Sequence, residues 1–234
     1  MTEMGPTTKA TGEAPPSRAR VWVALLATPM LLACAFLPVA GYLVTARGLS
    51  GEALAKAIEP LAVFPASIGF AASFLLTRWL ARKDGLTLSV LGWGRPTLAD
   101  AAVGVTAATV LGLLNAVWLY PLVQRSQPNF DPTLPSVSLP AAIVTLVVAA
   151  VAEDTLYRGY ALEVLSQRHG KVVSLLVTST FYALVTPARG LPLVLWAGYF
   201  GIVLGVLRFW RKSLWPVTLV HCVVALGPKV AAQF

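Results

Sequence analysis

The amino-acid sequence predicts an all-α fold, a polytopic transmembrane helix bundle of about seven spans, within a range of six to eight. Of the 234 residues, 57% are hydrophobic and only 12% are charged, and the mean hydropathy is +0.74. A soluble domain carries about 25% charged residues. The apolar residues also lie in long blocks rather than in short alternating runs. Long blocks favour membrane-spanning helices over a β-barrel.

The apolar blocks follow a polar, proline-containing head at residues 1–20. Most blocks reach the roughly 20 residues that a helix needs to cross about 30 Å of hydrocarbon, and the fifth and sixth are marginal. Hydrophobicity in the first block continues to about Val44, which predicts a retained helix rather than a cleaved signal. We therefore predict a polar cytoplasmic tail at 1–20 and a single membrane-embedded helical domain at 21–234. The blocks are residues 21–46, 61–80, 101–124, 139–165, 172–187, 191–207 and 214–232.

The net charge of +8 orients the chain and requires no nucleic-acid partner. Basic residues gather before the first block and after the second, fourth and sixth, whereas the alternate loops are poorer in them. This alternation predicts an integral membrane protein with its N-terminus in the cytoplasm, in a bacterial inner membrane or a comparable one. The basic positions are Lys9, Arg18, Arg20, Arg78, Arg82, Lys83, Arg95, Arg168, Lys171, Arg208, Arg211 and Lys212.

Small and aromatic residues add two expectations about packing. Gly201 and Gly205 form a G-x-x-x-G pattern, which we expect to allow close helix packing within the chain rather than dimerisation. Tryptophans near the ends of the spans are expected to anchor at the membrane interface. They are Trp79, Trp93, Trp118, Trp210 and Trp215.

Three charged residues, Glu153, Asp154 and Arg158, interrupt one of the most apolar regions. Each costs roughly 2.5–3.5 kcal/mol at membrane depth, so such a cluster is by default a candidate functional site. Neighbouring helical residues diverge by about 100°, so the two acids are expected to face different partners. A carboxylate beside an aqueous cavity can act as a general base, and Arg158 can pair with an acid or hold a substrate carboxylate. The alternative is a structural ion pair within the bundle.

His221 is the second informative residue, because it interrupts the last apolar block. It lies roughly 10 Å inside its span, and Glu153 lies about 12 residues from the cytoplasmic end of its own span, so both could open on one cytoplasm-facing cavity. The alternative is an ordinary packing residue. The sequence predicts no metal and no cofactor, since it has only two histidines, no H-E-x-x-H motif, no Walker loop and no dinucleotide fingerprint.

The run 153–159, EDTLYRG, resembles the E-E-x-x-x-R-G motif of the CPBP family. This family includes the type II CAAX prenyl proteases and bacteriocin-processing membrane proteases. The resemblance covers about residues 90–226. Its other segments are LGWGR at 91–95, STFYAL at 179–184, the helix with Gly198, Gly201 and Gly205, and SLWPVTLVH at 213–221.

The resemblance implies a glutamate-dependent intramembrane endopeptidase that acts on a membrane-anchored peptide or protein. Carried over by position, Glu153 would be the general base that activates water. Asp154 stands where the motif has its second glutamate, and Arg158 matches the motif arginine. His221 matches the histidine of a third motif, H-x-x-x-N or H-x-x-x-D, which stabilises the oxyanion.

Two positions differ from the family pattern. Val185 replaces the histidine of the F-x-x-x-H motif that begins at Phe181, and Ala225 replaces the asparagine or aspartate after His221. General acid–base assistance contributes about 10²- to 10⁴-fold in rate, and one oxyanion donor about 10²- to 10³-fold. Tyr182 and Thr186 flank the missing histidine and are candidate substitutes. Two further alternatives are that Glu153 and His221 suffice for a reactive substrate and that Asp154 accepts a proton.

Three functions remain open from the sequence. The first is a CPBP-type intramembrane endopeptidase that uses Glu153 and His221. The second is a catalytically defective pseudoprotease that binds or scaffolds a membrane partner and keeps the charged cluster for recognition. The third is a small transporter that uses the buried acids as a proton relay. The lipid bilayer is a partner in all three.

Overall fold

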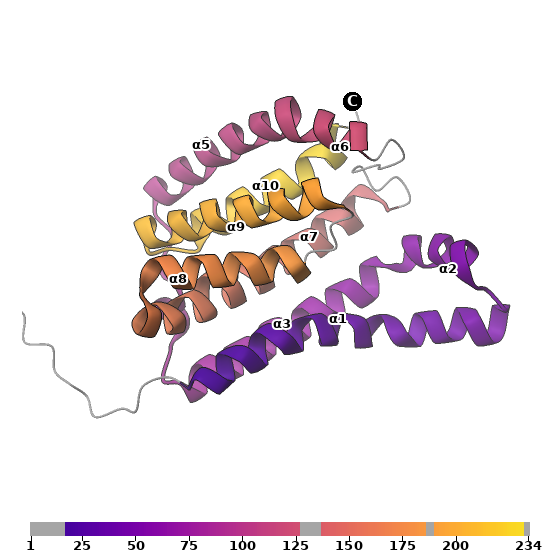
Figure 1. Cartoon of the computed structure of the whole chain (residues 1–234), viewed down its shortest axis with the longest axis horizontal. Coiled ribbons are helices and arrows are strands. Elements are labelled where there is room, and N and C mark those ends of the chain that lie inside the picture. The colour runs from indigo at the N-terminus through magenta and orange to yellow at the C-terminus, as the bar shows by residue number, and fades with distance from the viewer. Residues whose placement is uncertain (1–16, 127–136, 186–189, 232–234) are drawn as a thin grey trace, which may run out of the picture.

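The computed structural model describes residues 17–126, 137–185 and 190–231, and within these ranges it contains helices and no β-strand. Residues 1–16 of the predicted polar tail lie outside the described part. The long helices run side by side in a bundle (Figure 1). The helices are α1 Arg18–Arg47, α2 Gly51–Ile58, α3 Val63–Lys83, α4 Leu88–Leu91, α5 Leu98–Leu114, α6 Tyr120–Ser126, α7 Leu139–Glu153, α8 Leu162–Val185, α9 Leu191–Arg211 and α10 Trp215–Ala231, with short segments η1 Glu59–Leu61, η2 Asn115–Leu119 and η3 Asp154–Ala161.

The apolar helices are long enough for a polytopic membrane protein. Five stretches can cross a bilayer by length and composition: 19–47, 63–83, 98–125, 139–185 and 191–211. The 47-residue stretch 139–185 breaks at Gly170, whose φ of 76° and ψ of 167° are not helical, so it folds into two passes. The described residues also contain the shorter apolar helix Trp215–Gly227. The predicted all-α polytopic bundle is confirmed, and these segments are consistent with a predicted range of six to eight spans.

Helices α1 and α3 form a pair that is joined at one end by α2 (Figure 1). A hydrogen bond of 2.7 Å between the Thr28 and Ser73 hydroxyls links their buried faces. At the opposite end, the Asp84 carboxylate accepts hydrogen bonds from Arg20 on α1 and from Tyr160 on η3. This carboxylate therefore fastens the pair to the segment that carries the charged cluster. Sequence patterning did not predict α2 or the short α4.

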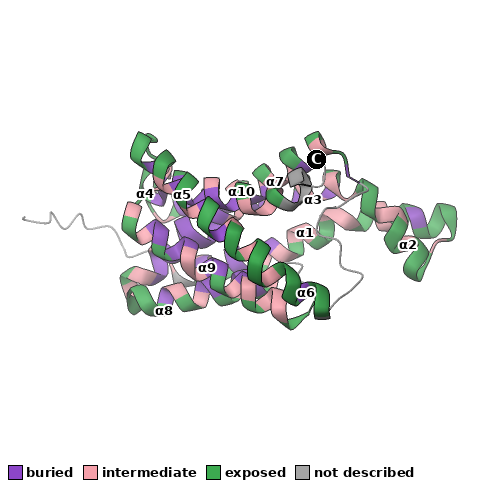
Figure 2. Ribbon diagram, turned by 90° about the horizontal axis from the view of Figure 1, so that it is seen from above, coloured by how far each residue is buried: buried purple, intermediate pink, exposed green. Residues whose placement is uncertain are grey.

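Buried residues concentrate where α7 to α10 meet, whereas α2 and α6 are largely exposed (Figure 2). Many of the exposed side chains are large and apolar, for example Met30, Leu37 and Leu195. Such surfaces are unusual when water is the solvent and expected when lipid is. The charged cluster lies in the buried central region.

Helices α8 and α9 approach closely because α9 carries glycines at the contact. A Cβ atom on Gly201 would lie 3.1 Å from the Cα atom of Ser179, and one on Gly205 would collide with the Leu175 side chain. The G-x-x-x-G pattern therefore packs within the chain, as expected.

Gly201→Ala is expected to destabilise the protein relative to Gly198→Ala by about 1–3 kcal/mol, because the new methyl group meets a rigid backbone atom. Gly198 is the matched control: it lies on the same helix, and its Cβ would sit 3.7 Å from Ala183, an ordinary contact. Both variants gain the same helix propensity, so their difference isolates packing. Thermal unfolding in detergent measures it, and equal midpoints would contradict the close approach.

Candidate active site

The charged cluster lies where α7 passes into η3, a π-helical segment whose eight residues are all buried. The Thr155 hydroxyl donates to the Val151 carbonyl over 2.6 Å, and it accepts a 2.8 Å hydrogen bond from the Trp93 indole nitrogen. Gly159 lets α4 approach, since a Cβ atom there would lie 3.2 Å from the Leu91 carbonyl oxygen. The π-helical turn of η3 is therefore accompanied by a side-chain hydrogen bond to its own backbone, from Thr155, and by contacts with Trp93 and Leu91 outside the helix. Such π-helical turns occur frequently at functional sites.

Asp154 is completely buried and has three polar partners. Its Oδ1 atom lies 3.3 Å from Arg158 Nη1 and 3.3 Å from His221 Nδ1. Its Oδ2 atom accepts a 2.9 Å hydrogen bond from the Thr218 hydroxyl. Burial of a carboxylate is tolerated when charge and hydrogen-bond partners compensate it. Asp154 therefore links η3 to Thr218 and His221 of α10, and these hydrogen bonds and the Arg158 charge offset the cost of burying its carboxylate.

Glu153 reaches the other nitrogen of the same imidazole. Its Oε2 atom lies 3.5 Å from His221 Nε2, and the Tyr182 hydroxyl lies 3.3 Å from that nitrogen. The rings of Phe200 and Tyr182 pack edge-on against the imidazole, with centroids 5.6 Å and 6.0 Å away. The histidine is thus held between two acids and two aromatic rings.

Glu153 and Asp154 are neighbours in the sequence and point in different directions, yet both reach His221, because each approaches a different nitrogen of its ring. We expected Glu153 and Asp154 to face different partners, and they instead contact different nitrogens of one partner. Arg158 pairs with Asp154, four residues earlier, which matches the ordinary spacing of a helical ion pair.

Arg158 is buried in an aromatic environment. Its guanidinium carbon lies 4.1 Å from the centroid of the Tyr182 ring, a cation–π contact that α8 contributes. Within the described ranges, the Nη2 atom of Arg158 and the Tyr157 hydroxyl are buried without a hydrogen-bond partner. The Ser179 hydroxyl, one turn before Tyr182, is likewise unsatisfied.

The two positions that differ from the family pattern lie one helical turn from site residues. Val185 ends α8 three residues after Tyr182, and Ala225 follows His221 by four residues on α10. Both are half-buried, and neither side chain can donate or accept a hydrogen bond. Thr186, the other candidate substitute, lies outside the described residues.

Two partners of the site were not singled out by the sequence. Thr218 binds Asp154, and Phe200 packs on His221. The sequence could have indicated Thr218, because it is a polar residue in an apolar run. It also precedes His221 by three positions, which places both on the same helix face. Phe200 gives no such signal among the other apolar residues of α9. In the part of the chain that is described, no group of three or more His, Cys, Asp or Glu side chains is arranged to hold a metal ion.

These observations define an integral membrane protein with an ionisable cluster of Glu153, Asp154, Arg158 and His221 between packed apolar helices. Residues 135–227 match the family model described as type II CAAX prenyl endopeptidase Rce1-like. The match contains all four residues and confirms the resemblance to the CPBP family over this part of the chain. It supports a CAAX-type intramembrane protease at the level of the family. Neither the curated proteins nor the solved structures gave a match to the chain.

Proposed function

We propose that this protein is a CPBP-type intramembrane endopeptidase that hydrolyses a membrane-anchored peptide or protein with water activated by Glu153. The observation that carries the proposal is the 3.5 Å approach of Glu153 Oε2 to His221 Nε2 across two helices. A carboxylate and an imidazole at this separation can exchange a proton directly or through one water molecule. A purely structural ion pair between Asp154 and Arg158 would not require this second carboxylate.

The proposed reaction balances with the side chains of the cluster. Glu153 takes a proton from water while the water oxygen attacks the scissile carbonyl carbon. The imidazolium form of His221 donates a hydrogen bond from Nε2–H to the developing oxyanion and keeps that proton throughout the step. The C–N bond then breaks, and the leaving nitrogen receives the proton held by Glu153. The products are an amine and a carboxylic acid, which loses its remaining proton to water.

Asp154 and Arg158 are assigned positioning roles. With its Nδ1–H donated to Asp154, the imidazole presents Nε2 to Glu153 and to the Tyr182 hydroxyl. A carboxylate in this place fixes the tautomer and the orientation of the ring, as it does in other histidine-dependent sites. Arg158 in turn balances the charge of Asp154.

The proposed orientation places the N-terminus in the cytoplasm of a bacterial cell. Basic residues from distant loops share one end of the bundle, where Arg20 and Arg211 bind Asp84 and Asp100, and where Lys171 lies 5.7 Å from the centroid of the Phe209 ring. A positive end of this kind favours the cytoplasmic side. His221 lies six residues after the start of α10 at this end, about 9 Å into the helix.

The second candidate function is a pseudoprotease that binds a membrane partner without cutting it. Val185 and Ala225 favour it, because each carries a hydrocarbon side chain at a position where the family motif has a polar one. In this case the cluster would recognise a partner, and Glu153 would accept a hydrogen bond rather than activate water.

Glu153→Gln distinguishes the two functions. The wild-type protein in proteoliposomes is expected to cleave a prenylated C-a-a-X peptide in oxygen-18-labelled water and to place the label in the new carboxylate. Glu153→Gln is expected to lower the rate by about 10²-fold or more, since glutamine cannot accept the proton. Mass spectrometry of the products measures both. Glu163→Gln is the matched control, because Glu163 follows η3 and contacts Gln167 rather than the imidazole.

Cleavage that persists in Glu153→Gln would overturn the assignment of the base. Binding of the peptide by both proteins without any labelled product would favour the pseudoprotease.

A further inference from the structure

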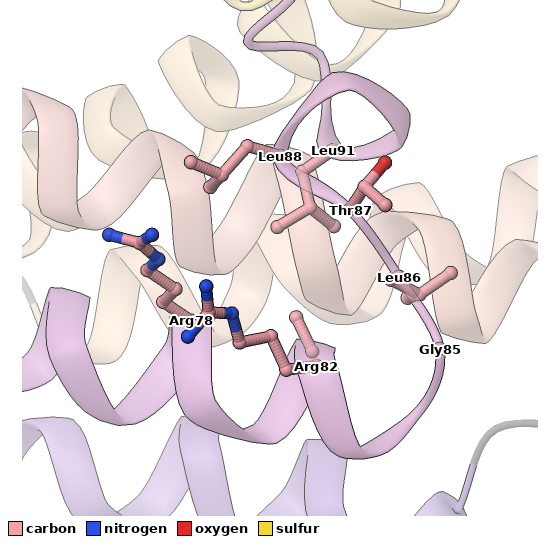
Figure 3. A pocket seen from close by; sticks show the side chains of 8 residues that line it. Arg78, Arg82, Gly85, Leu86, Thr87, Leu88 and Leu91 are labelled. Atoms are coloured by element: carbon pink, nitrogen blue, oxygen red, sulfur yellow. The ribbon is translucent and has the colours of Figure 1, made fainter.

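A hollow of about 360 Å³ lies between the end of α3 and the segment that leads into α4 (Figure 3), and no residue of the Glu153 cluster lines it. Two arginines of α3, one turn apart, extend into it, and leucines close the opposite side (Figure 3). The lining residues are Arg78, Ala81, Arg82, Gly85, Leu86, Thr87, Leu88 and Leu91.

The charge in this hollow is not compensated by the described protein. Neither Arg78 nor Arg82 forms an ion pair with any residue in the described ranges. The nearest acid in the sequence, Asp84, is already engaged by Arg20, by Tyr160 and by the Ser17 amide. Like charges four residues apart on a helix repel each other. An anion between the two guanidinium groups would remove that repulsion.

The hollow lies at the level where a lipid headgroup meets the acyl chains. Arg78 and Arg82 occupy the last turns of a membrane-spanning helix. Trp79 is exposed beside them, and the Lys83 ammonium lies 5.8 Å from the centroid of its ring. A tryptophan paired with a lysine at a helix end is typical of the membrane interface. The leucine side of the hollow offers an apolar surface next to the arginines.

We propose that this hollow binds the phosphate group of an anionic phospholipid. Two guanidinium groups provide parallel N–H donors that match phosphate oxygens, which is the geometry in which arginine surpasses lysine. The half-buried side chains of Leu86 and Leu88 would contact the glycerol and the first part of an acyl chain. Basic pockets between helices on the cytoplasmic side of membranes bind such headgroups.

The test counts lipids that stay bound to the intact protein. Native mass spectrometry of the full chain, released from mixed micelles of phosphatidylglycerol and phosphatidylcholine, is expected to show one retained phosphatidylglycerol. Arg78→Gln/Arg82→Gln is expected to lower its occupancy at least about tenfold, because the variant removes two charge-assisted contacts to the phosphate. Arg78→Lys/Arg82→Lys is expected to retain part of the binding, since the charge remains.

The matched control is Lys83→Gln/Arg95→Gln, which removes two charges without altering a lining residue. It is expected to keep the lipid. If the control loses as much phosphatidylglycerol as Arg78→Gln/Arg82→Gln does, net charge alone explains the loss, and the proposed binding site is overturned.

A third arm separates the two sources of phosphate. Failure of millimolar inorganic phosphate to displace the lipid supports the phospholipid. Displacement by inorganic phosphate, with no preference between the two lipids, assigns a free phosphate ion instead and overturns the lipid. Unchanged retention in Arg78→Gln/Arg82→Gln overturns binding at this hollow altogether, provided that the variant keeps the wild-type thermal unfolding midpoint. Because the readout is binding, it is independent of whether the protein cleaves peptides.

Discussion

Val185→His/Ala225→Asn is expected to raise the rate of peptide cleavage by about 10⁴-fold or more. The histidine would supply general acid–base assistance, worth about 10²- to 10⁴-fold, one turn after Tyr182. The asparagine would supply an oxyanion donor, worth about 10²- to 10³-fold, one turn after His221. The rate of labelled-carboxylate formation in proteoliposomes measures the gain for the double variant and for each single variant.

The gain in this double variant has to depend on Glu153 if the proposed chemistry is right. Adding Glu153→Gln in the same background is therefore expected to remove it. A folded double variant that cuts no faster than wild type, where wild type itself cuts, would mean that these two positions do not face the reacting bond.

Asp154→Ala is expected to destabilise the protein by about 3–5 kcal/mol. Arg158 has only 3% of its surface exposed, and removal of its carboxylate partner leaves a buried charge without compensation. The Thr218 hydroxyl and His221 Nδ1 would lose their acceptor in the same step. Unfolding in detergent, followed by tryptophan fluorescence, measures the loss.

A double-mutant cycle with Arg158→Met separates the ion pair from the other two contacts. If the buried charge causes most of the loss, Asp154→Ala/Arg158→Met is expected to be more stable than the sum of the single effects predicts. Strict additivity would mean that the pair contributes nothing. Glu52→Ala is the comparison variant, because Glu52 forms the same type of pair with Lys56 on the exposed surface, where no measurable loss is expected.

The membrane-spanning helices were predictable because lipid imposes a simple requirement on composition. The predicted block at 191–207, for example, falls inside α9, and the block predicted at 61–80 overlaps α3 from Val63 onward. The break between the fourth and fifth blocks falls at Gly170, whose backbone adopts a conformation that suits glycine. Helix α2 escaped prediction because its eight residues, Gly51 to Ile58, are too few for a span, and none of them is buried in a core.

The members of the charged cluster were predictable, but the contacts among them were not. A charge in an apolar run carries its own signal, so Glu153, Asp154 and His221 stand out. Their convergence depends on the rotation of two helices that are distant in sequence, which local periodicity does not determine. The arginine-lined hollow is of the same kind: Arg78 and Arg82 were interpreted only as orienting charges, because the facing leucines lie in the connection after α3 and in the short α4, which the sequence did not predict.

The π-helical segment η3 has a consequence for how this chain tolerates changes in length. A π-helical turn closes its hydrogen bonds one residue later than an α-helical turn, so it accommodates one extra residue. Removing one residue between Asp154 and Ala161 would therefore let an ordinary α-helix form and keep the later positions near their present rotation about the axis. Adding one residue to the regular helix after η3 would instead turn the later positions by about 100° and move Val164 away from its buried neighbours.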